Sequence, residues 1–135
     1  MPDNSLYRIL DVNFNRAKEG LRVCEDICRY VRDEKNLTRV FKDTRHDLTR
    51  TVEILGIRKA LAARDIAKDV GRNTSPSESE RKDMSAVFWA NAQRVKESLR
   101  VLEEIAKLID IKSAQRIKHL RYTVYAIEQK ALKKF

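Results

Sequence analysis

The apolar residues near the start of the chain recur with the 3.6-residue period of an α-helix. Over residues 5–32 they form one stripe along a single helix, made of Leu6, Ile9, Leu10, Ala17, Leu21, Cys24, Ile27, Cys28 and Val31. The same period predicts a second helix that begins after a turn at 33–36 and ends at Gly56, because glycine suits a left-handed helix cap. A short helical piece is expected over 57–63. The first half of the chain therefore predicts a helical hairpin.

The second half predicts another hairpin after an irregular segment at 64–77. Ser75 and Glu78, with a proline between them, form a capping box, so the third helix is expected to begin there and to reach residue 109. A fourth helix is expected over about 113–133.

The two predicted hairpins are related in sequence. Residues 13–31 and 91–109 align without a gap at an offset of 78. Nine of their nineteen positions are identical: Asn13/Asn91, Arg16/Arg94, Lys18/Lys96, Glu19/Glu97, Leu21/Leu99, Arg22/Arg100, Val23/Val101, Glu25/Glu103 and Ile27/Ile105. At an offset of 76, Phe41, Lys42, Arg45 and Leu48 match Ile117, Lys118, Arg121 and Val124. A helix–turn–helix unit is therefore present twice.

These patterns predict an all-α fold, a four-helix up-down bundle built from two duplicated helical hairpins with a functional connecting loop. A single domain spans 1–135, with repeat one at about 5–56, the connecting segment at about 57–77 and repeat two at about 78–134. Three glycines and two prolines leave too few turn residues for an all-β protein. No apolar run is long enough to span a membrane, so we expect a cytoplasmic protein. The net charge of +9 favours anionic partners.

Several polar residues fall where a helical core is expected. Asn13 lies within the apolar stripe of the first helix, Arg45 and Arg121 lie among apolar residues of the second and fourth, and Asn91 repeats Asn13. Two explanations are open: acids of the opposite helix pair with the arginines, or the residues line a binding cavity. We favour the cavity for the set, because buried ion pairs seldom stabilise a fold. The acids at 25 and 103 are expected to lie on the other side of their helices, in local salt bridges.

The connecting segment is long for a helical bundle and rich in charge. Asp65 and Asp69 offer carboxylate oxygens for Mg²⁺, and its arginines and lysine suit a polyphosphate; a solvated linker is the alternative. The chain has no Gly-rich phosphate loop, no dinucleotide fingerprint and no Ser/His/Asp set. Phosphoryl transfer remains compatible with these exclusions, because it needs positioning, metal and positive charge but no protein nucleophile.

Four ordered stretches resemble a known family, namely residues 10–27, 42–46, 64–71 and 90–104. They are similar to the small all-helical hydroxymethylpyrimidine phosphate kinase that occurs alone or fused to thiamine-phosphate synthase. The resemblance implies ATP-dependent phosphorylation of 4-amino-5-hydroxymethyl-2-methylpyrimidine phosphate to the diphosphate, in thiamine biosynthesis. It also suggests thiamine-phosphate synthase as a partner. We expect ATP and Mg²⁺ as cofactors, a homo-oligomer, and no membrane or nucleic-acid partner.

Our hypothesis for the site assigns each candidate residue a role. The phosphate clamp and catalytic set is Arg45, Arg121, Arg16 and Arg94; the substrate-binding set is Asn13, Asn91, Arg64 and Lys42; and the Mg²⁺ ligands are Asp65 and Asp69. The alternatives are a small-anion mutase, in which arginines hold carboxylates, and a helical nucleic-acid-binding module favoured by the basic charge.

Overall fold

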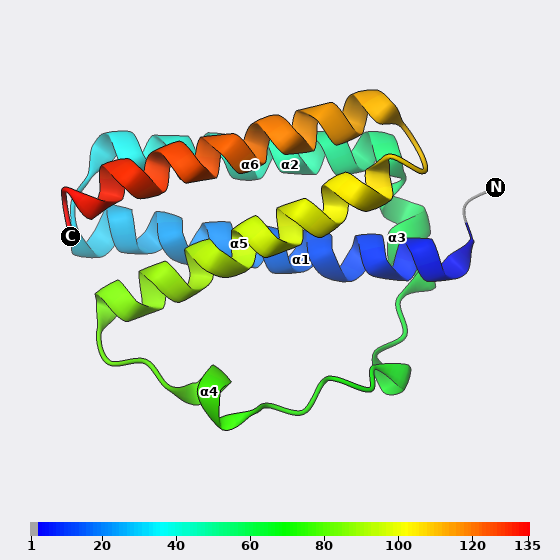
Figure 1. The fold of residues 1–135 in the computed structure, drawn as a ribbon, viewed down its shortest axis with the longest axis horizontal. Helices are drawn as coiled ribbons and strands as arrows, with labels where there is room; N and C mark the ends of the chain where they lie inside the picture. Colours follow the sequence, from blue (N-terminus) through cyan, green and yellow to red (C-terminus); the bar gives the residue numbers. More distant parts are fainter. Residues whose placement is uncertain (1–2) are drawn as a thin grey trace.

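The computed structural model describes residues 3–135, and within that range every regular element is helical (Figure 1). The α-helices are α1 (Asn4–Asp26), α2 (Lys35–Leu55), α3 (Ile57–Ala63), α4 (Pro76–Ser79), α5 (Met84–Ala106) and α6 (Ile111–Leu132). A π-helical turn, η1 (Ile27–Val31), continues α1, and a 3₁₀ turn, η2 (Ile66–Lys68), lies between α3 and α4. The predicted all-α class is therefore confirmed.

The four long helices form two antiparallel hairpins, α1 with α2 and α5 with α6 (Figure 1). Each hairpin contacts the other through both of its helices, because α1 packs on α5 and α2 packs on α6. In Figure 1, α2 and α5 run toward the same end of the bundle. The chain must therefore return along the whole bundle between them, which explains the length of the segment between α3 and α5, called here the connection (64–83).

The helix boundaries follow the sequence prediction except at the third long helix. Gly56 ends α2 with a φ of 121°, as the left-handed cap requires, and α3 occupies the predicted short helical piece. A helix does begin after Ser75, but its predicted continuation to residue 109 is wrong, because α4 is a single turn and α5 begins at Met84. Asp83 caps α5 by accepting a hydrogen bond from the Ala86 amide at 2.8 Å. A capping signal alone does not extend a helix whose next residues have no apolar face to bury.

The core runs between the four long helices, and α1 and α5 make their closest contact at Gly20. Gly20 of α1 allows close contact with α5, because a Cβ there would lie 2.6 Å from Val95 Cγ2 and 3.2 Å from the Asn91 carbonyl oxygen. The repeat equivalent of Gly20 is Ser98, which is also small and is buried. Phe41, Phe88 and Phe135 fill one end of the bundle with edge-to-face contacts.

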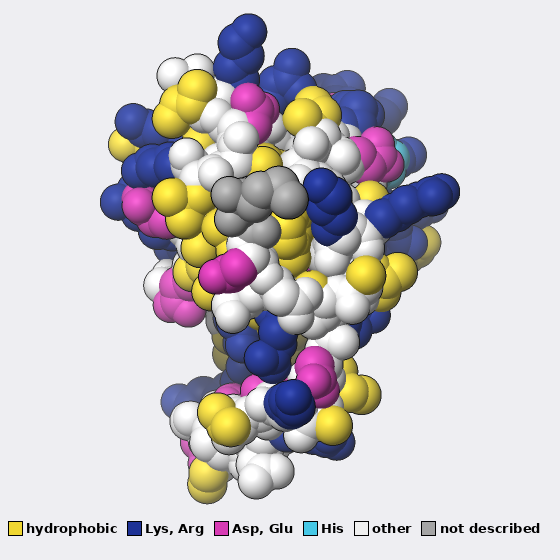
Figure 2. Space-filling view, turned by 90° about the vertical axis from the view of Figure 1, so that its right-hand side faces the viewer, with side chains coloured by type: hydrophobic (Ala, Val, Ile, Leu, Met, Phe, Trp, Pro, Cys, Tyr) yellow, Lys and Arg dark blue, Asp and Glu magenta, His cyan; other side chains and the backbone are white. Residues whose placement is uncertain are grey.

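The connection projects from the bundle on the side of α1, as the end-on view in Figure 2 shows. Almost all of its side chains are exposed to solvent. None of the helices in residues 3–135 is both long and apolar enough to cross a membrane.

Candidate functional site

The arginines of α2 and α6 are bound to glutamates of the neighbouring helices in the same way in both repeats. Arg45 Nε lies 3.0 Å from Glu25 Oε1, and Arg121 Nε lies 3.0 Å from Glu103 Oε1. Both glutamates are almost fully buried, so their predicted place on the far side of the helix is wrong. Because α2 packs on α1 and α6 packs on α5, the buried faces of α1 and α5 are wider than their apolar stripes indicate. Of the two explanations for Arg45 and Arg121, the structure supports pairing with acidic side chains of the neighbouring helix.

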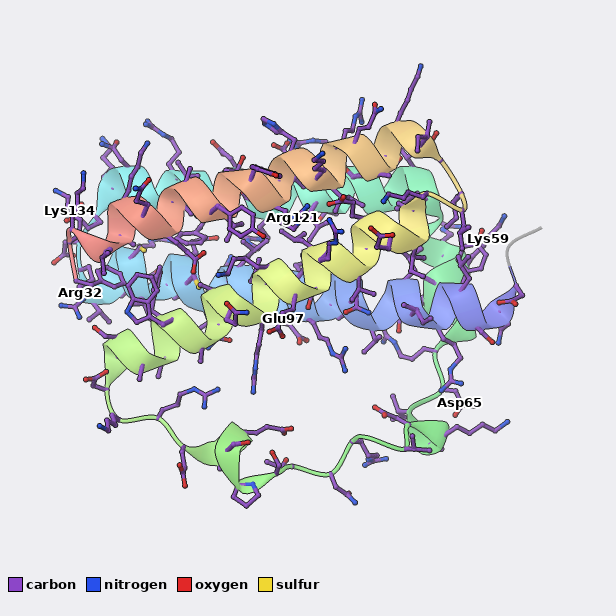
Figure 3. The ribbon with its side chains drawn as sticks, in the orientation of Figure 1. Arg32, Lys59, Asp65, Glu97, Arg121 and Lys134 are labelled. Atoms are coloured by element: carbon purple, nitrogen blue, oxygen red, sulfur yellow. The ribbon has the colours of Figure 1, made fainter. Side chains whose placement is uncertain are left out.

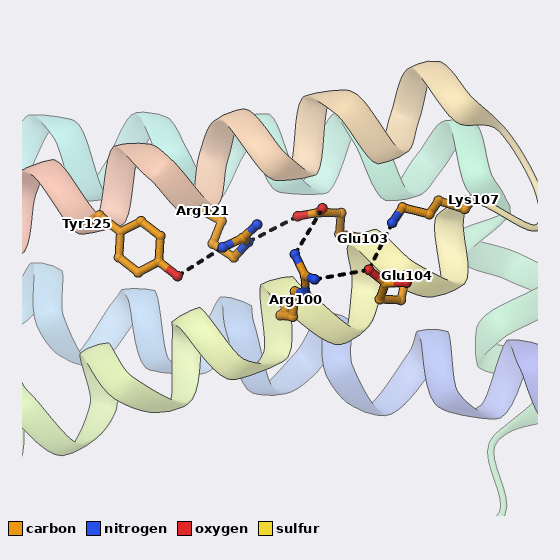
Figure 4. A network of polar contacts seen from close by, with 6 residues as sticks. All are labelled: Arg100, Glu103, Glu104, Lys107, Arg121 and Tyr125. Carbon is orange, nitrogen blue, oxygen red and sulfur yellow. Dashed lines mark hydrogen bonds and ion pairs between the residues drawn. The ribbon is translucent and has the colours of Figure 1, made fainter.

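Local ion pairs surround each buried pair on the outside. In the second repeat, Arg100 lies 3.5 Å from both Glu103 and Glu104, and Lys107 donates to Glu104 at 2.9 Å (Figure 4). The hydrogen bond from Lys107 lowers the pKa of Glu104. Burial alone would lower the pKa of Arg121, but its hydrogen bonds with Glu103 and with the Tyr125 hydroxyl raise it overall.

The two repeated asparagines bind their own helices. The Asn13 amide donates to the Ile9 carbonyl at 3.0 Å, and the Asn91 amide donates to the Val87 carbonyl at 2.8 Å. Their positions on α1 and α5 are equivalent, and Asn91 lies at the crossing next to Gly20. The donors of both side-chain amides are therefore satisfied within their own helices.

A groove of about 560 Å³, called here groove A, runs between α1 and the start of the connection. Its lining residues are Ser5, Arg8, Ile9, Asp11, Val12, Asn15, Arg16, Glu19, Arg64, Asp65, Ile66 and Asp69. Four residues that the sequence singled out meet here: Arg16, Arg64, Asp65 and Asp69. Figure 3 shows Asp65 at the point where the connection leaves the bundle. The structure thus brings the charged part of the connection against the first helix.

Arg64 and Asp11 fix the edge of groove A. Arg64 donates from Nε to Asp11 Oδ2 at 2.7 Å and from Nη2 to Asp11 Oδ1 at 2.9 Å. This hydrogen bond and the charge of Asp11 raise the pKa of Arg64. Asp11 was missed by the sequence reasoning. Its signal was an acid immediately after Leu10 in the apolar stripe, where a buried carboxylate needs a partner.

Asp65 and Asp69 are held in place by turns of the connection. Asp65 Oδ1 accepts from the Lys68 amide at 3.2 Å, and Asp69 Oδ1 accepts from the Gly71 amide at 3.0 Å. Residues 3–135 contain no cluster of three or more His, Cys, Asp or Glu side chains that could hold a metal alone. Two carboxylates in one groove still fit Mg²⁺, because this ion keeps several waters and takes phosphate oxygens as further ligands.

A second groove of about 510 Å³, called here groove B, lies between α5 and α6. It is lined by Gln93, Lys96, Glu97, Arg100, Arg121 and Tyr125, of which the sequence had singled out only Arg121 as a site residue. Figure 3 shows Glu97 on α5 and Arg121 on the side of α6 that faces α5. Lys96 is fixed by an ion pair with Glu128 at 3.0 Å.

The other predicted site residues line neither groove. Asn13, Asn91 and Arg45 bind within the bundle, whereas Lys42 of α2 and Arg94 of α5 are exposed to solvent. In place of the single binding cavity that the sequence predicts, the structure therefore has two separate grooves and a network of buried ion pairs.

Comparison with known proteins shows the family to which the chain belongs. The model of the ThiD2 family matches residues 8–130. The chain is 45% identical over 127 residues to a thiamine-phosphate synthase of Thermosynechococcus vestitus, covering 92% of this chain and 34% of that protein. It is 42% identical over 124 residues to a thiamine-phosphate synthase of a Nostoc species, covering 91% and 34%. A thiamine-phosphate synthase of Rhodopirellula baltica is 38% identical over 123 residues, with coverage of 90% and 33%.

The chain spans about a third of the length of these curated relatives. No solved structure matches it. The family match covers most of both hairpins, the connection, all of groove B and all of the groove A lining except Ser5. On this match, the chain belongs to the ThiD2 family.

Proposed function

We propose that this chain is an ATP-dependent kinase that phosphorylates hydroxymethylpyrimidine phosphate to the diphosphate, in thiamine biosynthesis. Groove A is the observation that carries the proposal. Its three arginines and the carboxylates of Asp65 and Asp69 face one space, and this is the donor set that a magnesium-bound phosphate chain requires. The volume of about 560 Å³ is within the range of small-molecule sites.

The proposed reaction needs no protein nucleophile. An oxygen of the pyrimidine phosphate attacks the γ-phosphorus of ATP, a new P–O bond forms, and the bond to the β-phosphate oxygen breaks, so that its electron pair leaves with ADP. Because the attacking oxygen is already ionised near neutral pH, no general base is needed. Mg²⁺, when bound, neutralises charge on the phosphates. Arg16 and Arg64 orient the phosphates by hydrogen bonds and offset the repulsion between the two anions.

The structure changes the roles that we propose for several residues. Arg121 reaches groove B and remains a candidate for phosphate binding. Exposed Arg94 also remains a candidate, since it lies on α5 next to the crossing with α1. We now propose that Arg45, Asn13 and Asn91 position α1, α2 and α5, because their polar groups are bound inside the protein.

The relatives' names indicate the formation of thiamine phosphate, which is a different step. We propose that the kinase acts in the same pathway and that thiamine-phosphate synthase is its partner. The relatives are about three times as long as this chain, which leaves room in them for a second catalytic unit. A homo-oligomer that completes each site from two subunits stays a further proposal.

The test is ADP release, measured with a coupled assay. We expect turnover with hydroxymethylpyrimidine phosphate and Mg²⁺, and none with free hydroxymethylpyrimidine, whose uncharged hydroxyl lacks the phosphate that the arginines bind. A thermal-shift assay separates the kinase from a small-anion mutase, since MgATP should raise the melting temperature and dicarboxylates should not. No ADP release from the phosphorylated pyrimidine would remove the kinase proposal.

The distribution of charge supports one other candidate, a nucleic-acid-binding module. Basic and acidic side chains are equal in number on α1 and on α5, whereas α6 carries five basic side chains and one acidic one. The excess charge therefore gathers away from groove A. A nucleic-acid module would bind duplex or single-stranded DNA with an affinity that falls steeply with salt, and the kinase would not.

A further inference from the structure

Groove B presents an aromatic ring surrounded by positive charge. The Tyr125 side chain is 43% exposed, although α6 has an ample apolar side that faces the core. Its hydroxyl accepts a hydrogen bond from Arg121 Nη1 at 2.9 Å (Figure 4). Lys96 Nζ lies 5.7 Å from the ring centre. The hydrogen bond fixes the ring, and the two cations favour an anion beside it.

The ring belongs to the second repeat alone. The cations Lys96, Arg100 and Arg121 have equivalents at Lys18, Arg22 and Arg45. The equivalent of Tyr125 is Thr49, so the first repeat keeps the charges and lacks the ring. Because Tyr125 is not needed to fill the core, its ring is available to recognise a ligand.

Groove A and groove B differ in the anions that they suit. Groove A is lined by four carboxylates, those of Asp11, Glu19, Asp65 and Asp69, whereas groove B is lined by one, that of Glu97. Carboxylates suit a phosphate chain that arrives with Mg²⁺. An aromatic ring with lysine and arginine suits a planar aromatic compound that bears a phosphate.

We infer that groove B binds the aromatic phosphate monoester, with its ring against Tyr125 and its phosphate on Arg100 and Lys96, and that groove A binds the magnesium nucleotide. This assignment rests on the proposed kinase function. Arg100 is free to turn toward a phosphate, because it is half-exposed and its ion pairs at 3.5 Å are long. Glu103 keeps its pair with Arg121 when Arg100 turns away.

The two grooves lie along the two helices that cross. Groove A lies along α1 and groove B along α5, and Gly20 of α1 lies against Val95 of α5. Transfer from a nucleotide in groove A to a phosphate in groove B would require the two ligands to meet beside this crossing.

The test is calorimetric titration of the whole chain with hydroxymethylpyrimidine phosphate in the absence of nucleotide. We expect Tyr125→Ala and Arg100→Ala each to weaken binding about tenfold or more. Tyr125→Ala removes an aromatic stacking partner and Arg100→Ala removes hydrogen bonds to a charged phosphate, and either loss has an effect of that order. Tyr125→Phe keeps the ring and should retain most of the affinity. Arg22→Ala is the matched control, because Arg22 makes the equivalent ion pairs in the first repeat and lines neither groove.

Amide chemical shifts of the unmodified protein give a second measurement that does not depend on the folding of a variant. We expect the pyrimidine phosphate to shift amides at 93–100 and 121–125, and MgATP to shift those at 5–19 and 64–69. Wild-type affinity in both Tyr125→Ala and Arg100→Ala, or shifts confined to groove A, would overturn the inference. Binding in groove B without ADP release would support the inference and remove the kinase proposal, so the two fail separately.

Discussion

Arg64 and Asp11 join the connection to the first helix through two parallel hydrogen bonds between a guanidinium and a carboxylate, at 2.7 and 2.9 Å. The pair links segments 53 residues apart in sequence. Asp11 is buried and Arg64 is exposed, so the arginine closes over a carboxylate that would otherwise be unpaired at the edge of groove A.

Loss of this pair should reduce activity more than stability. We expect Arg64→Ala to lower kcat/KM for MgATP by about tenfold or more, because Asp65 follows directly and the segment that carries Asp65 and Asp69 loses its attachment to α1. Arg64→Lys should recover little, since lysine cannot make the paired hydrogen bonds. The measurement is steady-state kinetics together with thermal melting, and Arg58→Ala is the control, because Arg58 of α3 is exposed and lines neither groove. Equal kinetics for both alanine variants would contradict a role for the pair.

The carboxylate of Asp69 should set the requirement for magnesium. Asp69→Asn keeps the acceptor for the Gly71 amide and removes the negative charge. We expect the Mg²⁺ concentration for half-maximal rate to rise about tenfold, since Mg²⁺ prefers charged oxygen ligands. Glu80→Gln removes an exposed carboxylate of the same connection that lines neither groove, so it should leave the requirement unchanged. A magnesium titration of ADP release measures both.

The long helices and part of the lining of groove A could be predicted from the sequence because both leave local signals. Gly56 marks the end of α2, and the 78-residue offset reveals the second hairpin. The charged connection predicted Arg64, Asp65 and Asp69, and these three do meet in one groove. Each of these signals depends on neighbours along the chain.

The features that the sequence did not reveal depend on contacts between helices. A helical projection of α1 gives the direction of Glu25 but not the helix that covers it, so the pair with Arg45 was left as one of two explanations. The capping box at Ser75 and Glu78 was misleading because no tertiary packing supports a longer helix there. Tyr125 reads as one more surface tyrosine until the packing of α5 on α6 places its ring beside Lys96 in groove B.

The buried pair of Glu103 and Arg121 should be important for stability. Both side chains are less than 10% exposed, so Glu103→Ala leaves a buried guanidinium without its carboxylate, which costs about 3 kcal/mol. Replacing both residues, with Glu103→Leu and Arg121→Met, should recover most of the loss because no charge remains buried. Urea unfolding measures each variant. Glu104→Ala on the same helix is the exposed control and should leave the midpoint nearly unchanged.

The crossing of α1 and α5 should tolerate no added atom at Gly20. Alanine stabilises a helix by about 0.5–1 kcal/mol relative to glycine, but its Cβ would lie 2.6 Å from Val95 Cγ2. Overpacking of this kind costs about 1–3 kcal/mol, so Gly20→Ala should be destabilising overall. In Gly71→Ala the new Cβ meets only Asp69 Oδ1 at 3.7 Å, and stability should change by less than about 0.5 kcal/mol. A more stable Gly20→Ala variant would contradict the close crossing.

The cap of α6 should make part of the stability depend on pH. Asp110 accepts hydrogen bonds from the Ser113 hydroxyl at 2.6 Å and from its amide at 3.2 Å, and these lower the Asp110 pKa below its ordinary 3.8. A carboxylate whose pKa is lower in the folded state stabilises fully above its unfolded pKa, and this contribution is lost as pH falls through the folded pKa. Asp110→Asn keeps an acceptor for the cap without the charge. We therefore expect the wild-type protein to have the higher urea midpoint at pH 7, and the difference from Asp110→Asn to disappear as the pH falls through the lowered pKa of Asp110. A difference that stays constant over this range would show that the charge of Asp110 does not contribute to the cap.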